Sequence, residues 1–212
     1  MRLRNVKNKN EILNNSKYLV KDCFRYKSNW SSLFNNDNPI FIEIGMGKGK
    51  FIIQNALLNP DINFIGIEKQ DSILARGLKN IPDGIKNLLI IRADANMIDE
   101  IFYKEIDKIY LNFSDPWPKN RHHLRRLSSK IFLDKYDDVF KGVNTIEMRT
   151  DNRQLFSYSL VSFSENDYIL KKISLDLHHD DMPEVTTEYE DKFSSLNMPI
   201  YYVLCQKTRK RD

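Results

Sequence analysis

Short apolar runs alternate with amphipathic segments along most of the chain. Four runs are bounded by turn residues and read as buried parallel strands, at 40–44, 62–68, 88–91 and 106–113. Further strands are predicted at 145–150, 167–177 and 200–205, and helices at 51–58, 71–79, 128–140 and over a segment with Leu155, Phe156, Leu160 and Phe163. This alternation of strands and helices predicts an α/β domain, and 212 residues are enough for one full core.

The chain ahead of the first apolar run is predicted to pack on this core. Residues 1–10 form a basic, Asn-rich arm, for which a disordered tail and a nucleic-acid contact both remain open. Residues 11–24 are predicted to be helical, with Ile12, Leu13, Leu19, Val20 and Phe24 as candidate buried positions. Trp30, Leu33 and Phe34 could pack this segment over the sheet. We therefore divide the chain into an arm and helix at 1–37, a main domain at 38–207 and a basic tail at 208–212.

Composition narrows the class of protein without naming a function. A hydrophobic content of 41% and a charged content of 29% are ordinary for a globular domain. The net charge of +4 mildly favours a polyanionic binding partner. Cys23 and Cys205 have no metal-ligand spacing. We see no signal peptide and no apolar run of membrane-spanning length, so we expect a cytoplasmic protein without membrane contact.

A glycine-rich loop follows the first strand, in the pattern Glu43-x-Gly45-x-Gly47-x-Gly49. Strand, glycine loop and helix together open a nucleotide-binding α/β fold. The third glycine comes one residue earlier than in the dinucleotide fingerprint Gly-x-Gly-x-x-Gly. The Glu43 carboxylate would disfavour a pyrophosphate and favour an ammonium or sulfonium. This spacing resembles motif I of the class I methyltransferases, which bind S-adenosylmethionine.

Acidic residues stand near the ends of five predicted strands. They are Glu43, Glu68, Asp94, Asp115 and Asp151. The carboxyl ends of parallel strands meet at one edge of a sheet, where like charges repel unless a cation offsets them. S-adenosylmethionine is such a cation, and Mg²⁺ is the competing one. Glu68 can accept both ribose hydroxyls of either an NAD or an S-adenosylmethionine nucleoside, and Asp94 can bond an adenine amino group or cap a helix.

A proline-stiffened loop and a basic cluster follow the fourth strand. Pro116 and Pro118 fix the backbone around Asp115, at a strand end where a held side chain is useful to a site. The next residues form a basic cluster that contains no acid. For this cluster a contact with the phosphates of RNA or DNA is favoured over an ordinary solvated surface. Its members are Lys119, Arg121, His122, His123, Arg125 and Arg126. The two adjacent histidines are poorly placed to chelate one metal.

Three motifs carry a specific family resemblance. They are N-F-S-D-P-W-P-K at 112–119 with Arg121 and His122, T-D-N-R at 150–153 and T-E-Y-E at 187–190. Their order and spacing resemble the bacterial tRNA (guanine-N7-)-methyltransferase family over about residues 38–207. The resemblance implies a Rossmann-like class I methyltransferase fold, with a seven-stranded, mostly parallel sheet, a reversed terminal hairpin and helices on both faces.

The resemblance also implies an activity and a set of site residues. The activity is methyl transfer from S-adenosylmethionine to N7 of guanine 46 in the variable loop of tRNA, with no metal. The implied cofactor positions are Glu43, Gly45, Gly47, Gly49, Glu68, Asp94 and Asp115, of which Asp115 is also at the reaction centre. The implied substrate positions are Lys119, Asp151, Thr187, Glu188, Tyr189 and Glu190. The implied RNA-binding loop comprises Arg121, His122, His123, Arg125 and Arg126.

Guanine N7 carries a lone pair and no proton, so transfer to it needs alignment and exclusion of water but no general base. Asp115 is then an aligning and electrostatic partner. Asp151 or Glu190 could read the guanine N1–H and amino group, which adenine lacks as a donor pair. Three alternatives remain: a methyltransferase for another nucleic acid or a small molecule, a catalytically silent tRNA-binding module, and, more distantly, an NAD oxidoreductase. The sequence leaves monomer and homodimer open.

Overall fold

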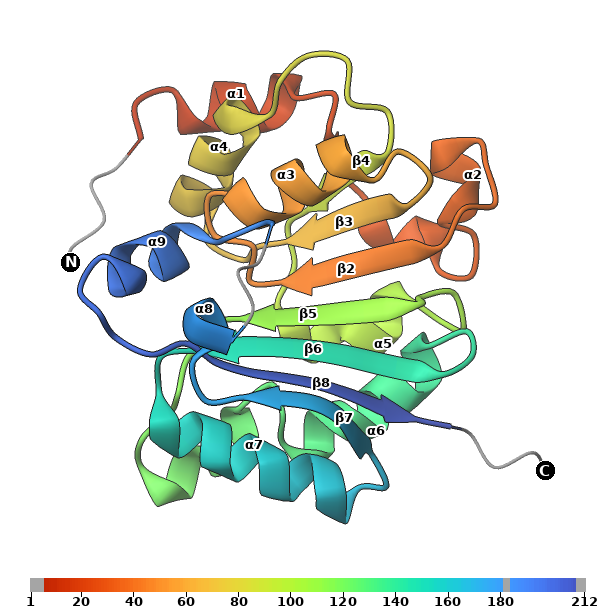
Figure 1. The fold of residues 1–212 in the computed structure, drawn as a ribbon. Helices are drawn as coiled ribbons and strands as arrows, with labels where there is room; N and C mark the ends of the chain where they lie inside the picture. Colours follow the sequence, from red (N-terminus) through yellow and green to blue (C-terminus); the bar gives the residue numbers. More distant parts are fainter. Residues whose placement is uncertain (1–5, 181–183, 209–212) are drawn as a thin grey trace.

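A mixed eight-stranded sheet organises residues 6–180 and 184–208, the part of the chain that the computed structural model describes (Figure 1). Its spatial order is β1-β4-β3-β2-β5-β6-β8-β7. The strands are β1 Leu19–Val20, β2 Ile40–Ile44, β3 Asn63–Ile67, β4 Leu88–Ile91, β5 Lys108–Asn112, β6 Asn144–Thr150, β7 Ile169–Ser174 and β8 Tyr201–Lys207. All neighbours are parallel except β8, which is antiparallel to both β6 and β7. The expected reversed terminal hairpin is therefore present.

Helices cover both faces of the sheet, as expected (Figure 1). The α-helices are α1 Lys9–Asn15, α2 Ser31–Phe34, α3 Lys50–Leu58, α4 Asp71–Asn80, α5 Ile98–Ile101, α6 Lys130–Val139, α7 Arg153–Glu165, α8 Leu177–Asp180 and α9 Glu188–Ser194. Short 3-10 helices are η1 Cys23–Tyr26, η2 Ala95–Met97 and η3 Asn120–Arg125. None of these described helices is long and apolar enough to cross a membrane.

Each face of the sheet has its own apolar core, because side chains alternate along a strand. In β3, Phe64 belongs to the cluster that contains residues of α3 and α4, whereas Ile65 and Ile67 belong to the cluster that contains residues of α5, α6 and α7. Every residue of β3 is buried. The continuous apolar runs of the sequence were therefore correctly interpreted as parallel strands covered on both sides.

The eighth strand is a correction to the seven that were predicted. The helix expected over 11–24 ends at Asn15, and Leu19 and Val20 pair with Ile90 and Ile91 as a short parallel strand. The edge of β4 offers unpaired backbone groups, and the Ile90 amide donates to the Tyr18 carbonyl at 2.8 Å. This tertiary pairing outweighs the local helical pattern.

Several individual burial predictions also change. Phe24 is 44% exposed, although it was expected to be buried, whereas Trp30 is fully buried and its indole N–H donates to the Ile101 carbonyl at 3.0 Å. Ile131 was predicted on the buried face of its helix but is 44% exposed and lines a cavity. The strand predicted at 167–177 is shorter, since β7 ends at Ser174 and α8 begins at Leu177, and residues 181–183 lie outside the described part.

Candidate active site

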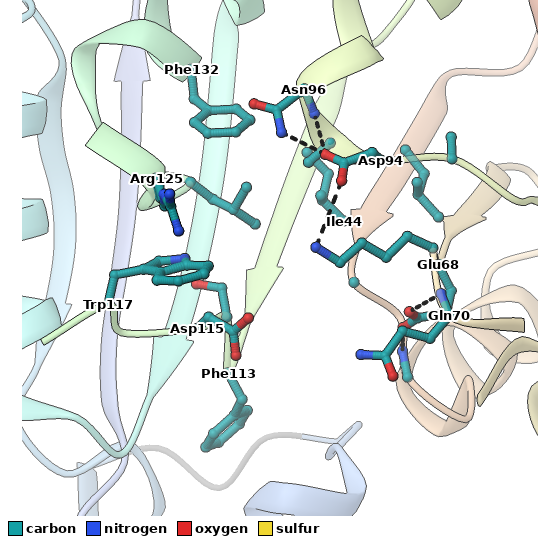
Figure 2. Close-up of a pocket in the computed structure, with 18 of the residues that line it drawn as sticks. Ile44, Glu68, Gln70, Asp94, Asn96, Phe113, Asp115, Trp117, Arg125 and Phe132 are labelled. Atoms are coloured by element: carbon teal, nitrogen blue, oxygen red, sulfur yellow. Dashed lines mark hydrogen bonds and ion pairs between the residues drawn. The ribbon is translucent and has the colours of Figure 1, made fainter. Parts of the chain in front are cut away.

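A cavity of about 630 Å³ opens at the carboxyl edge of the parallel strands (Figure 2). Its walls come from the loops after β2, β3, β4 and β5, from the start of α6, and from Tyr189 of α9. Its polar lining consists of Gly45, Gly47, Glu68, Lys69, Gln70, Asp94, Asn96, Ser114, Asp115 and Arg125. The predicted meeting of strand ends at one edge is thus where the cavity lies.

The glycine loop presents open backbone to this cavity. Gly45, Gly47 and Gly49 have φ of +81°, +60° and +82°, values that other residues rarely adopt. A Cβ built on Gly45 or Gly47 would meet nothing within 4 Å, so a ligand can approach the backbone there. The amides of Gly45 and Met46 both donate to the Ile67 carbonyl, at 2.9 and 3.0 Å, which ties the loop to the end of β3.

Glu43 lies beneath the glycine loop and not in the cavity wall. Its side chain is 2% exposed, Oε1 accepts from Asn112 Nδ2 at 2.9 Å, and Oε2 has no partner among the described residues. Burial, with a smaller contribution from the charge of Glu188, raises the pKa of Glu43 to about 8 against the opposing effect of the Asn112 hydrogen bond. A buried carboxylate with an unpartnered oxygen is costly unless a cation approaches it.

Glu68 joins the glycine loop to the loop after β3. Its Oε2 accepts from the Gly47 amide at 3.2 Å and its Oε1 accepts from the Gln70 amide at 2.9 Å. Burial raises the pKa of Glu68 more than these hydrogen bonds lower it. Each carboxylate oxygen has a second lone pair, so Glu68 can still accept from a diol in the cavity.

Asp94 caps η2, which is one of its two predicted roles. Its Oδ1 accepts from the amide and the side-chain nitrogen of Asn96, at 2.9 and 2.7 Å, and these bonds lower the pKa of Asp94. Its Oδ2 is 3.6 Å from Lys69 Nζ (Figure 2). Because Asp94 also lines the cavity, capping does not remove it from a ligand's reach.

Asp115 is exposed and lines the cavity from the loop after β5. Two bulky residues of this region have positive φ, Phe113 at 49° and Trp117 at 42°. Such strained backbone persists where the surroundings enforce it. The Phe113 amide donates to the Arg149 carbonyl at 2.8 Å, and Arg126 donates to the carbonyls of Pro116 and Trp117 at 3.0 and 3.1 Å. The predicted stiff loop is therefore fixed at both ends.

Arg126 corrects the prediction of a uniformly RNA-facing basic loop. It is 7% exposed, bonds to two carbonyls, and has its guanidinium 4.3 Å from the Tyr158 ring. These contacts turn it inward, away from any phosphate. Lys119, Arg121 and His123 are exposed, whereas Arg125 lines the cavity with its guanidinium 5.0 Å from the Trp117 ring. Across residues 6–180 and 184–208, no group of three or more His, Cys, Asp or Glu could hold a metal ion.

The helix α9 begins with a capping box between Thr187 and Glu190, and Glu190 is completely buried. The Glu190 carboxylate accepts from the Thr187 amide at 3.2 Å, from Arg149 Nη1 at 3.1 Å and from His178 Nε2 at 2.9 Å. Glu190 is thus enclosed, which removes it as a reader of guanine. Asp151 and Glu188 remain partly exposed, and Tyr189 is 56% exposed.

Arg149 is the residue that sequence reasoning missed. It is 7% exposed within β6, and it donates to Glu190, to Glu147 Oε1 at 3.2 Å and to the Val185 carbonyl at 2.8 Å. It therefore connects the sheet to the segment that carries Tyr189. A charged residue inside a buried strand was the available signal, because such a charge needs a partner.

Comparisons with known proteins agree with this geometry. A family model described as "Putative methyltransferase" matches residues 37–203. Among solved structures, an antibiotic-related methyltransferase has a TM-score of 0.63 at 17% identity, covering 86% of this chain and 94% of its own. The 16S rRNA methyltransferase KamB has a TM-score of 0.63 at 12% identity, covering the same shares. At these identities the likeness shows the fold alone.

Sequence relatives are much more similar. The tRNA (guanine-N(7)-)-methyltransferase of Bacillus velezensis is 47% identical over 205 residues, covering 95% of this chain and 94% of that protein. The enzyme of the same name from Lachnoclostridium phytofermentans is 44% identical over 214 residues, covering 99% and 100%. With this identity over nearly its whole length, the chain belongs to the tRNA (guanine-N7-)-methyltransferase family.

Proposed function

We propose that this chain transfers the methyl group of S-adenosylmethionine to N7 of guanine 46 in the variable loop of tRNA, in the cytoplasm. The observation that carries the proposal is the exposed Asp115 carboxylate, held by a stiff loop between the acidic, glycine-lined side of the cavity and its aromatic side. The identity of about 45% to curated tRNA (guanine-N(7)-)-methyltransferases supports the same substrate.

The acidic side of the cavity fits the cofactor. Open backbone at Gly45 and Gly47 leaves room for a ligand, Glu68 can accept from the ribose hydroxyls, and Asp94 can accept from the adenine amino group. The unpartnered Oε2 of Glu43 lies beneath this loop and favours positive charge above it. S-adenosylmethionine supplies a methyl group activated by attachment to a sulfonium.

The protein's part in the reaction is alignment and charge stabilisation. N7 has no proton to remove, so Asp115 acts without being a general base. Its carboxylate is placed to orient the purine and to stabilise the positive charge that the purine gains on methylation. Pro116, Pro118 and Arg126 keep this carboxylate in place, which lowers the reorganisation needed for transfer.

Base and RNA recognition fall to other residues. Asp151, at the end of β6, is the carboxylate that we propose reads the guanine N1–H and amino group, since Glu190 is enclosed. Lys119, Arg121 and Arg125 are proposed to contact phosphates around the cavity mouth, with the neighbouring His122 and His123. Thr187 and Glu188 belong to the same proposed substrate side through α9.

The central test replaces Asp115 by Asn, which keeps its size and removes its charge. We expect turnover to fall by about a hundredfold or more, with tRNA affinity changed less than threefold, because Asp115 acts at the transition state. Tritiated methyl transfer from S-adenosylmethionine to tRNA, followed by nucleoside identification, gives the rate and the product. The exposed Asp167→Asn variant serves as a control.

Other outcomes would redirect the proposal. Equal losses of turnover and tRNA binding in Asp115→Asn would make this loop structural. A product other than 7-methylguanosine would identify a methyltransferase with a different target. A chain that binds tRNA but gives no calorimetric signal with S-adenosylmethionine would be a silent binding module.

A further inference from the structure

Three aromatic rings meet where α9 crosses the end of β5. The centroids of Phe113 and Tyr189 are 5.9 Å apart, those of Phe113 and Phe193 are 6.1 Å apart, and those of Tyr189 and Phe193 are 6.3 Å apart. The interplanar angles are 21°, 24° and 22°, so the three rings share one orientation. We call Phe113, Tyr189 and Phe193 the aromatic platform. Phe113 and Tyr189 line the cavity.

Phe113 and Phe193 pack against the buried cluster of Leu177, Ile200 and Tyr202. This packing does not account for the backbone strain at Phe113 or for the exposure of Tyr189. Phe113 has a φ of +49°, which is costly for a bulky side chain, and Tyr189 is 56% exposed although its ring packs on two others. Backbone strain clusters at ligand contacts, and here the strained residue lines a cavity together with an exposed aromatic side chain.

The platform lies next to Asp115, two residues after Phe113. In Figure 2 the Asp115 carboxylate projects into open space between the labelled rings of Trp117 and Phe113. The Trp117 ring is already covered by the Arg125 guanidinium at 5.0 Å and meets the His122 ring edge-on at 5.8 Å. Trp117 is only partly exposed, whereas Tyr189 of the platform is 56% exposed, so the platform is the aromatic surface beside Asp115 that is more available to a planar ligand.

We propose that the aromatic platform is the stacking subsite for the acceptor purine, which leaves its stack in the RNA to reach the methyl donor. This rests on the function proposed above and deepens it by assigning Phe113 and Phe193. A purine loses stacking when it is extruded, and an aromatic surface replaces that stacking without reading the base. Stacking fixes the plane of the purine, so that the N7 lone pair can be turned toward the methyl group while Asp115 lies at its edge.

The test is a thermodynamic cycle between protein and RNA. Affinity is measured in the presence of S-adenosylhomocysteine for tRNA with guanine at the acceptor position and for tRNA that is abasic there. The wild-type protein is compared with Phe113→Leu and Tyr189→Leu, which keep apolar bulk but lose the ring. Tyr189→Phe keeps the ring and is the matched control.

We expect either leucine variant to weaken binding of the guanine tRNA about tenfold, and of the abasic tRNA less than twofold. Tyr189→Phe should retain the wild-type difference in affinity between guanine tRNA and abasic tRNA. The affinity for S-adenosylmethionine, measured by calorimetry, should stay within about threefold in all variants, and this binding also shows that they are folded. If Phe113→Leu fails to bind the cofactor, Tyr189→Leu and Phe193→Leu carry the test.

Two results separate the failures. If the wild type methylates guanine N7 but both leucine variants weaken the binding of guanine tRNA and of abasic tRNA equally, the platform is a structural contact and this inference is overturned. If the wild type forms no 7-methylguanosine, the proposed function itself fails, whatever the cycle shows.

Discussion

At the scale of single residues, Glu43 is a buried carboxyl group whose ionisation the fold disfavours. It is almost completely buried, has one hydrogen bond, and leaves Oε2 unpartnered, so its pKa rises to about 8. The folded protein therefore holds a proton that the unfolded chain releases near pH 4.5. A cation bound above the glycine loop would offset this cost.

This shift gives a prediction for stability against pH. Between about pH 4.5 and pH 8 the unfolded state binds fewer protons at Glu43 than the folded state, so the free energy of unfolding should fall as pH rises through this window. The full contribution is roughly 5 kcal/mol. Glu43→Gln should flatten the profile and exceed the wild type in stability at pH 8.5, measured by urea unfolding. Parallel profiles for the two proteins would contradict the assignment.

At the scale of elements, the glycine loop is positioned by packing from below. A Cβ at Gly66 of β3 would lie 2.4 Å from Met46 Sδ and 2.9 Å from Ile90 Cδ1. Met46, in the middle of the loop, is buried against β3 only because Gly66 leaves that space. The contact between Met46 and β3 therefore fixes the position of the glycine loop relative to the sheet.

We therefore expect Gly66→Ala to weaken S-adenosylmethionine binding at least tenfold, because Met46 and the loop must move. It should also destabilise the protein by about 1 to 3 kcal/mol. Gly142→Ala is the matched control, since a Cβ there meets nothing within 4 Å and its φ is not positive. Calorimetry and thermal unfolding measure both effects. Equal affinities for the two variants would show that the loop is not positioned through Met46.

The helix α9 is held by a buried ion pair instead of by apolar packing alone. Arg149→Met would leave the fully buried Glu190 with His178 and the Thr187 amide but without its cation, which should cost about 3 to 5 kcal/mol. Lys130→Met removes an exposed pair with Asp134 and should cost about 0.5 kcal/mol or less. Urea unfolding of both variants, with the Arg149→Met/Glu190→Gln double mutant, tests this. A double mutant no more stable than Arg149→Met would argue against the pair.

At the scale of the whole molecule, exposed basic residues and the cavity share one edge of the sheet. Arg121 and Arg125 belong to this edge, whereas Arg25 lies on η1. Just after η1, the Ser28 amide donates to Glu105 Oε1, which lies ahead of the amino end of β5. A polyanion that enters the cavity would therefore meet positive charge at its mouth.

The matching prediction concerns salt. Replacing Arg121 and Arg125 by Gln should weaken tRNA binding, and the slope of log affinity against log salt should shrink by about 0.7 to 0.9 for each phosphate that the protein no longer neutralises. Arg25→Gln should leave the slope unchanged, because η1 lies near the amino end of β5 and contributes no residue to the cavity lining. Filter binding over a range of salt concentrations measures the slopes. Identical slopes for the wild type, the Arg121 and Arg125 variant and Arg25→Gln would show that the loop with Arg121 and Arg125 does not contact tRNA phosphates.

The sequence by itself determined the elements and the edge at which the site forms. The strands at 40–44 and 88–91, the glycine turn and the capping box of Thr187 and Glu190 depend on residues close together in the chain. Parallel pairing then brings the strand ends to one rim whatever the side chains do there. For this reason the position of the cavity and of Asp115 was predictable.

Tertiary packing alone decided which predicted residues face the cavity. Glu190 and Arg126 were both predicted to be site residues, but both side chains are turned inward. Glu190 is held by Arg149, which is distant in the sequence. Arg126 is held by the Pro116 and Trp117 carbonyls across its loop. The edge pairing of Leu19 and Val20 likewise depended on β4. A local pattern fixes which backbone conformation is favoured, whereas the direction of a charged side chain depends on where its desolvation is compensated, and that is known only once the chain has folded.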